Sequence, residues 1–477
     1  MKKIIQHYLS QKYLAFMFGL VLIVTSCSDD ETTQPLFDKS AEERVQAEIS
    51  VLRNTLLESE FGWVASYRPA EETGYFRFLF KFEEDGTVET QTNFDSNLFG
   101  DDAGRRSVSE YEIVQGSTTK LSFTTEGLIH RLSDSNFSPI PGRGNGGSGL
   151  KGDFEFLYFG KSDNGDTLAF RANRTQPDNN TQYIVRFVRA GSESENSLST
   201  DPINDIGEST QKSVYQALVY DPGSGGEQLT ASVDYNTRLR TLTMRRLIEE
   251  SDTSYFEDEY VAGMDYLSGN RIRLDSLRLG ENELFRDVIL QYDQPTGFFN
   301  SVEINGESDS RISIGSRDKP FILTKDYLDL IDPAQTFNLL FIYRDPDIGD
   351  LTTPAFNTVH ADYGRDFRLY TFFRFDSGVT LKEFLFIFQG ATGNSSLLQQ
   401  LEYNVDADRN RLIFINKGLV NGAPIDPSGQ PFLNLLTDPE GFYVENLGSV
   451  TRFTNQIYTL TSVSNPAIRM GFYHILP

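Results

Sequence analysis

Two acidic stretches, residues 345–350 and 406–410, carry oxygen ligands at alternating positions, a spacing that a calcium-binding loop uses. The second stretch lacks the glycine expected at the sixth loop position, where Arg411 stands, and the acid expected at the twelfth, where Lys417 stands. Turn chemistry is the favoured explanation of both stretches, and calcium binding is the alternative. Calcium is the one cofactor that the sequence suggests, and the candidate ligands are Asp345, Asp347, Asp350, Asp406, Asp408 and Asn410.

The sequence contains no recognisable catalytic motif. Gly142, Gly144 and Gly147 match G-x-G-x-x-G, but a dinucleotide site needs that loop between a strand and a helix. Here prolines precede the loop and an expected strand follows it. No G-x-S-x-G, phosphate-binding loop or H-E-x-x-H occurs, and the histidines lack ligand spacing. We therefore expect a protein that is not an enzyme, although the many carboxylates leave a glycosidase-like pair open.

Cys27 is the single cysteine of the chain and stands at the end of a secretory signal. Lysines begin the sequence, the eleven apolar residues 14–24 follow, and small residues come just before the cysteine. The apolar run is too short to span a bilayer. The arrangement is similar to a bacterial lipobox, in which the thiol is acylated and becomes the mature N-terminus. The alternative is a short membrane anchor with a chance cysteine.

An acidic cluster follows the cysteine directly: Ser28, Asp29, Asp30 and Glu31. In the Bacteroidota such a cluster resembles the signal that sends lipoproteins to the outer face of the outer membrane. We therefore expect an anchor in outer-membrane lipid through acylated Cys27, with the chain facing the cell exterior. The alternative is a solvated acidic tether without an addressing role.

The charge of the chain excludes one class of partner. The formal net charge is −25, and removal of residues 1–26 takes away three lysines and no acid. Nucleic-acid binding needs clustered Lys and Arg to neutralise phosphates, so we expect no nucleic-acid partner. With Cys27 acylated no thiol remains, so neither a disulfide nor a cysteine nucleophile is expected.

Hydrophobic periodicity predicts one helix followed by a β-barrel. Ser40 and Glu43 form a capping-box pattern, and an apolar stripe that includes Ile49 and Leu52 continues the helix to about Glu58. The period then changes to two, and eight short strands over about 130 residues suit a closed antiparallel barrel. The expected strands are Trp63–Arg68, Tyr75–Phe82, Thr87–Thr92, Val108–Val114, Lys120–Thr124, Phe154–Gly160, Thr167–Arg171 and Tyr183–Arg189.

The second expected strand has two unlike faces. Phe76, Phe78, Phe80 and Phe82 alternate along it and are predicted to be buried, since four large rings on an open face would aggregate. The intervening Arg77 and Lys81 are predicted to face solvent. Gly62-Trp63 resembles the start of lipocalin-like barrels, which predicts that Trp63 plugs one barrel end.

Composition and strand patterns predict the fold class of the whole chain and its division into segments. The fold class is mainly β: a lipocalin-like antiparallel β-barrel with one packed helix, followed by one or two further antiparallel β domains. The stretches 270–274 and 410–414 resemble each other, which suggests that a β module is used more than once. The expected segments are a signal peptide at 1–26, a tether at 27–37, the helix and barrel at 38–190, a linker region at 191–228, a middle β domain at 229–345 and a C-terminal β domain at 346–477.

Three runs carry a resemblance to a known family: GWVASYRPAEETGYFRFLFKFEEDGTV, YEIVQGSTTKLSF and GLKGDFEFLYFGKSDNGDTLAFRANR. Over residues 40–190 the chain resembles the uncharacterised Bacteroidota lipoprotein family called domain of unknown function 4302. The resemblance implies a surface lipoprotein, often encoded beside transporters of the SusC/SusD type, and implies no catalytic residues.

Two further function classes stay open beside the one that the resemblance favours. We expect a non-catalytic surface protein that captures or presents a glycan or peptide ligand for such a transporter, or docks on it. The alternatives are a surface-anchored hydrolase with a carboxylate pair and a structural or adhesive surface protein.

Overall fold

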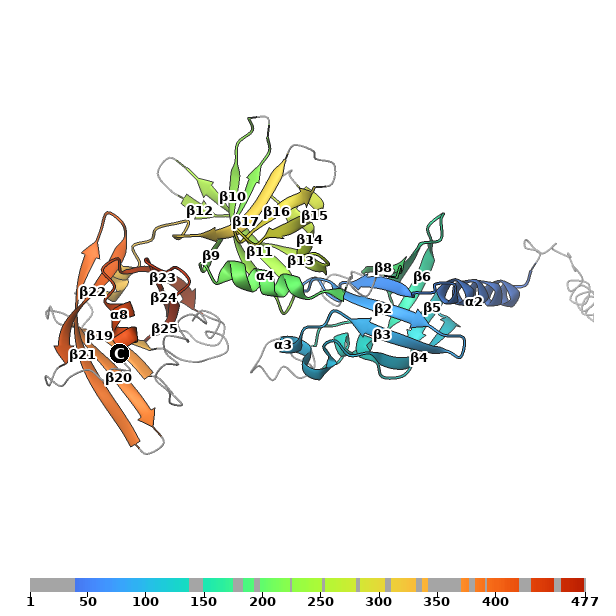
Figure 1. Cartoon of the computed structure of the whole chain (residues 1–477), viewed down its shortest axis with the longest axis horizontal. Coiled ribbons are helices and arrows are strands. Elements are labelled where there is room, and N and C mark those ends of the chain that lie inside the picture. The colour runs from blue at the N-terminus through green and yellow to red at the C-terminus, as the bar shows by residue number, and fades with distance from the viewer. Residues whose placement is uncertain are drawn as a thin grey trace, which may run out of the picture. The chain divides into compact units, whose positions relative to one another are not determined.

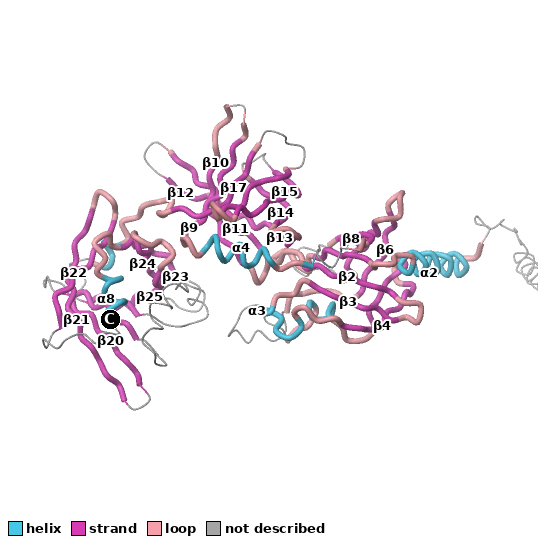
Figure 2. The backbone as a smooth tube through the Cα atoms, in the orientation of Figure 1, coloured by secondary structure: helices cyan, strands magenta, loops and turns pink. Residues whose placement is uncertain are grey.

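The computed structural model describes residues 39–136, 149–174, 183–192, 198–223, 225–250, 254–279, 284–304, 310–331, 337–341, 370–376, 382–390, 393–419, 430–449 and 456–475. Antiparallel strands dominate this part of the chain, and helices are few (Figures 1 and 2). The chain divides into two compact units after Leu52, inside the first described helix, and all described strands belong to the second unit. The predicted mainly-β fold class is confirmed.

Helix α2 (Ala41–Leu57) begins at the predicted capping box. The Glu43 backbone N–H donates to the Ser40 hydroxyl at 3.2 Å, and the Ser40 N–H donates to the Glu43 carboxylate at 2.8 Å. Two otherwise unsatisfied N–H groups of the first turn are thereby paired. Along the predicted apolar stripe Ile49 is half-buried and Leu52 is buried.

An eight-stranded antiparallel barrel follows, with its strands paired in sequence order and closed by pairing between β1 and β8. Phe76, Phe78, Phe80 and Phe82 are all buried inside it, as predicted. The Phe80 ring lies 4.9 Å from Phe123 and 5.3 Å from the ring of Phe187, between centroids. The strands are β1 (Trp63–Tyr67), β2 (Phe76–Phe82), β3 (Thr87–Thr92), β4 (Ser107–Gln115), β5 (Thr119–Phe123), β6 (Glu155–Lys161), β7 (Thr167–Ala172) and β8 (Ile184–Arg189), with short helices α3 (Ser96–Phe99), η1 (Gly100–Asp102) and η2 (Leu128–Leu132) between them.

Trp63 is fully buried at the start of β1, as predicted for a plug. Its indole N–H donates to the carbonyl of Leu56 at 2.9 Å, and the guanidinium of Arg189 lies 4.9 Å from its ring centroid. Gly62, just before it, has φ +84°, and a Cβ there would collide with the Phe80 carbonyl. Only glycine suits this close approach of two backbones.

A second ring of eight strands is preceded by helix α4 (Asp201–Thr210), which contacts β13 and β17. The β10–β11 pairing closes eight of the nine strands into a ring, and the short β12 pairs with β11 as the ninth strand. The strands are β9 (Tyr215–Asp221), β10 (Leu229–Asn236), β11 (Thr241–Glu249), β12 (Ser254–Phe256), β13 (Tyr260–Leu267), β14 (Arg271–Arg278), β15 (Leu284–Asp293), β16 (Phe298–Glu303) and β17 (Arg311–Arg317).

A third barrel is closed by pairing between β18 and β25 and is preceded by the short helix α5 (Tyr327–Leu330). Helix α8 (Gln430–Leu436) lies between two of its strands in the sequence, and Leu433 and Leu436 are buried in the same core as Phe442. The strands are β18 (Phe337–Phe341), β19 (Tyr370–Asp376), β20 (Lys382–Gly390), β21 (Gly393–Asp406), β22 (Arg411–Leu419), β23 (Phe442–Ser449), β24 (Gln456–Ser462) and β25 (Arg469–Ile475).

All three barrels therefore share one topology: sequential strands closed first to last, with a helix ahead of the first strand. The two resembling stretches 270–274 and 410–414 each open the fifth strand of a barrel, and Asn270 and Asn410 have φ of 58° and 51°. Their likeness reflects the same left-handed turn residue, which asparagine tolerates. Some boundaries differ from expectation: α4 and β9 occupy part of 191–228, and β18 precedes residue 346.

The packing of β2 predicts a strong contrast between neighbouring residues. Phe80→Ala should lower the free energy of unfolding of the first barrel by about 3–5 kcal/mol, because it empties a site in the ring cluster. Lys81→Ala, on an exposed side chain, should change it by less than about 0.5 kcal/mol. Trp63, the single tryptophan, allows this barrel to be followed by fluorescence during urea denaturation. Equal effects of the two substitutions would contradict the register.

Candidate functional site

Asp265 lies on the outer face of the second barrel and is nevertheless fully buried. On β13 the residues Ala262, Met264 and Tyr266 belong to the barrel core, so the alternating Asp265 points outward. Its cross-strand partner on β14 is Arg273. An outward carboxylate can be this inaccessible only because another part of the chain covers it.

The first barrel provides that cover through the outer faces of β1 and β2, and the neighbouring β8 continues the same face. Across these strands Arg186 lies opposite Ser66, and Ser66 lies opposite Arg77. In the next outward row Val188 lies opposite Val64. A polar, arginine-containing row and an apolar row therefore run side by side over this face.

Three side chains from both barrels meet the Asp265 carboxylate. Arg77 donates to it through Nε at 2.7 Å and Nη2 at 3.0 Å, and Arg273 donates at 3.0 Å. Ser66 adds a hydroxyl hydrogen bond at 2.9 Å. Burial opposes ionisation, but the two guanidinium groups outweigh it and hold the pKa of Asp265 below its ordinary value. The prediction that Arg77 faces solvent is therefore wrong: it is an inter-barrel ion-pair partner.

A second contact lies beside the first. Arg68, after β1, donates to the Asp275 carboxylate at 2.5 Å. The Tyr75 ring lies under Arg273, whose guanidinium is 4.9 Å from the ring centroid. At Gly263 on β13 a Cβ would come within 2.9 Å of the Asp275 carboxylate and 3.2 Å of the Tyr75 ring. The absence of a side chain there lets the first barrel approach.

Backbone groups and a buried arginine complete the junction. The N–H of Gly74 donates to the Leu239 carbonyl at 2.6 Å, and that of Tyr75 donates to the Met264 carbonyl at 2.9 Å. Arg240 is fully buried and donates to the Asn93 side chain at 2.7 Å and to the Asn93 carbonyl at 2.6 Å. Arg240 has φ +57°, an uncommon conformation for arginine, in the turn that places it between the barrels.

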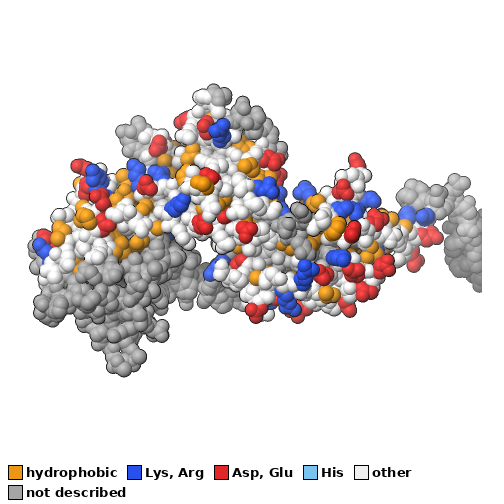
Figure 3. Space-filling view, viewed as in Figure 1, with side chains coloured by type: hydrophobic (Ala, Val, Ile, Leu, Met, Phe, Trp, Pro, Cys, Tyr) orange, Lys and Arg blue, Asp and Glu red, His pale blue; other side chains and the backbone are white. Residues whose placement is uncertain are grey.

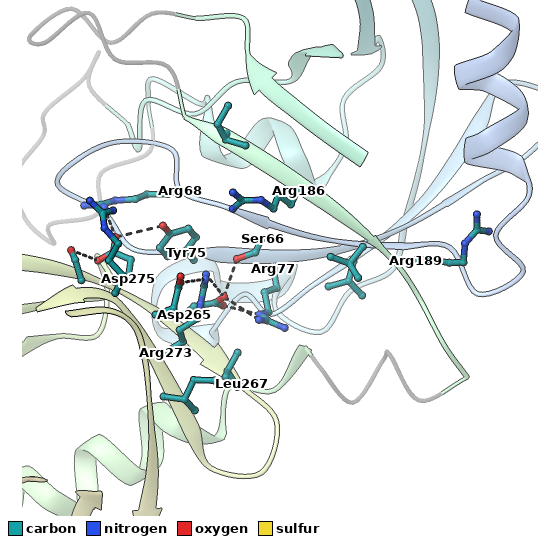
Figure 4. Close-up of a pocket in the computed structure, with 17 residues that line it drawn as sticks. Ser66, Arg68, Tyr75, Arg77, Arg186, Arg189, Asp265, Leu267, Arg273 and Asp275 are labelled. Atoms are coloured by element: carbon teal, nitrogen blue, oxygen red, sulfur yellow. Dashed lines mark hydrogen bonds and ion pairs between the residues drawn. The ribbon is translucent and has the colours of Figure 1, made fainter. Parts of the chain in front are cut away.

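A cleft of about 820 Å³ opens between the two barrels at this junction (Figure 4). Among the described residues, six arginines and three aspartates line it, together with aliphatic residues. The aspartates are already paired: Asp265 with Arg77 and Arg273, Asp275 with Arg68, and Asp287 with Arg273. Figure 3 shows basic and acidic side chains interspersed over the face in view, so a lining with twice as many arginines as acids is a local feature.

The candidate residues from the sequence that the structure describes, Asp406, Asp408 and Asn410, do not line this cleft. Cys27, Ser28, Asp29, Asp30 and Glu31 fall outside the described residues, as do Asp345, Asp347 and Asp350. Asp406 lies at the end of β21, where its two carboxylate oxygens accept from the Arg409 backbone N–H and the Arg411 guanidinium. Asp408 is exposed in the same turn, and Asn410 follows it in the left-handed conformation.

These contacts are those of an ordinary tight turn, the alternative that the sequence left open. Within the described residues no three His, Cys, Asp or Glu side chains group in a way that could hold a metal ion. In the same part of the chain no helix combines the length and hydropathy needed to cross a membrane.

Fold and site define the class: a serial β-barrel protein whose first two barrels are joined by a buried ion-pair network. A sequence model of the family named Domain of unknown function (DUF4302) matches residues 33–291, more than half of the chain, and the protein belongs to that family. The match runs across the inter-barrel junction and ends within β15. No curated protein matches the sequence.

The junction predicts a pH-dependent contribution from Asp265. Asp265→Asn should lower the free energy of unfolding at pH 7 by about 2–4 kcal/mol, because two guanidinium groups lose their charged partner. Because the pKa of Asp265 is depressed in the folded state, the destabilisation by Asp265→Asn should be complete above the unfolded pKa of about 3.9. It should disappear as the pH falls below that value and through the folded pKa. Urea denaturation at pH 7 and at pH 3 measures this.

Arg77→Ala supplies the matched comparison with Lys81→Ala on the same strand. Arg77→Ala should lower the free energy of unfolding at pH 7 and Lys81→Ala should not, because only Arg77 reaches the buried carboxylate. A pH-independent effect of Asp265→Asn would mean that its charge is not what holds the barrels.

Proposed function

We propose that this chain is a non-catalytic lipoprotein of the outer-membrane surface. In this proposal it captures or presents a ligand for a SusC/SusD-type nutrient transporter, or docks on that transporter. Cys27 carries the lipid, and the Ser28–Glu31 cluster directs export to the cell exterior.

The observation that supports the non-catalytic part of the proposal is the state of the described carboxylates in the cleft. A glycosidase needs one carboxyl group to protonate the leaving group and a second to act as base or nucleophile. In the cleft each of the three aspartates is engaged by arginine, and the pKa of Asp265 is lowered rather than raised. That chemistry supports ligand binding over hydrolysis.

The transporter association is tested on native membranes. The lipidated chain is tagged at its C-terminus, solubilised in a neutral detergent and purified, and the co-purifying proteins are identified. Recovery of SusC/SusD-type components is expected, with an unrelated surface lipoprotein from the same cells as the control. Recovery of the chain alone under conditions that keep other transporter complexes intact would contradict the proposal.

The anchor gives a separate prediction. Cys27→Ala should move the protein from the membrane fraction to the soluble fraction, because no thiol remains for acylation. Ser28→Ala, next to it, should stay membrane-bound and serves as the control. If the Cys27→Ala protein remains in the membrane with residues 1–26 still attached, the lipoprotein assignment is wrong.

Surface display is tested through the acidic cluster. Replacement of Asp29, Asp30 and Glu31 by alanine should protect the protein from protease added to whole cells, while lysed cells still permit digestion. Whole-cell digestion of this variant at the wild-type rate would instead mean that the cluster is a solvated tether without an addressing role.

A further inference from the structure

We propose that the inter-barrel cleft binds a small amphipathic anion, held by Arg186 and Arg286 through its acidic groups and by neighbouring aliphatic side chains through its apolar body. This inference rests on the proposed function and names the chemistry of the captured ligand.

The first step is to ask which arginines of the cleft are already used. Arg68, Arg77 and Arg273 neutralise the three aspartates, and Arg189 pairs with Asp166 at 3.3 Å beside the Trp63 ring. Arg186 on β8 and Arg286 on β15 are exposed and have no ion-pair partner among the described residues.

These two arginines come from different barrels and line the same cleft. Figure 4 labels Arg186 on the first barrel, on the same side of the cleft as Arg68. Two guanidinium groups without ion-pair partners in the described part of the chain, in a hollow of a protein with net charge −25, mark a place where anions are attracted and cations are not. Guanidinium groups also match the fork geometry of carboxylate, sulfate and phosphate.

The apolar part of the ligand follows from the residues beside Arg186. On the outward face of β8, Ile184 and Val188 flank it and are 48% and 47% exposed. Ile289 faces the cleft from β15. Aliphatic side chains left this exposed within a concave, charged site provide apolar contact area that an inorganic ion would not use. A volume of about 820 Å³ lies within the range of about 300–1,000 Å³ usual for small-molecule sites.

The test uses the full lipidated chain in neutral detergent and isothermal titration calorimetry with three probes. Naphthalene-2,6-dicarboxylate is the amphipathic anion, inorganic sulfate is the plain anion, and naphthalene-2,6-dimethanol is the uncharged analogue. Titrations into micelles alone are subtracted. The dicarboxylate should bind more tightly than either of the others, and added NaCl should weaken its binding.

Variants then assign the binding to the cleft. Arg186→Gln and Arg286→Gln should each weaken dicarboxylate binding by roughly tenfold, since each removes a charge-assisted contact. Val188→Ser should weaken the binding of the dicarboxylate and leave the binding of sulfate unchanged. Arg311→Gln, at an exposed arginine of β17 outside the cleft, is the matched control and should bind as wild type. Unchanged thermal unfolding verifies that each variant is folded.

Three outcomes overturn the inference: no dicarboxylate binding by the wild type, equal binding of the uncharged analogue, or wild-type affinity in the Arg186→Gln/Arg286→Gln double variant. Failure of the proposed function is seen separately, in the membrane purification. If transporter components co-purify with the chain but the chain does not bind the dicarboxylate, this inference alone is rejected. Probe binding without those components would reject the proposed function alone.

Discussion

The fully buried Asp265 carboxylate is the constraint on which the relation between the first two barrels depends. A carboxylate without counter-charges would be far too costly to remove from water. Its counter-charges are Arg273 of its own barrel and Arg77 of the other, so both guanidinium groups reach the carboxylate only when both barrels are in place. The Gly74 and Tyr75 backbone hydrogen bonds reinforce the same junction.

The first barrel could be predicted closely from the sequence because its signals are local. Alternation of phenylalanine with polar residues along β2, an Asp-Gly turn and a capping box at Ser40 each act within a few residues. Their strand and helix bounds agree with the structure to within one or two residues. For the remainder of the chain the sequence predicts further antiparallel β domains but not their closure, because closure pairs the first strand of each barrel with its last, far away in the chain.

The cleft could not be predicted in this way, because its residues are brought together by the packing of two barrels. Arg77 and Asp265 are 188 positions apart, and each looks like an ordinary surface residue of an alternating strand. One signal was present: Asp265 stands among apolar residues in a strand whose neighbouring outward position, Gly263, has no side chain. Conversely, Asp406 and Asn410 had a conspicuous spacing that turn geometry explains.

First-to-last strand closure has a consequence for how the protein can be divided. The second barrel is complete only when β17 pairs with β9, so residues up to Arg317 are needed to close it. A fragment ending at residue 291, where the family match stops, would lack β16 and β17 and leave β9 and β15 with unpaired backbone edges. Such edges recruit strands from other chains. Fragments for crystallisation or display should therefore keep the first two barrels together and be cut after β17.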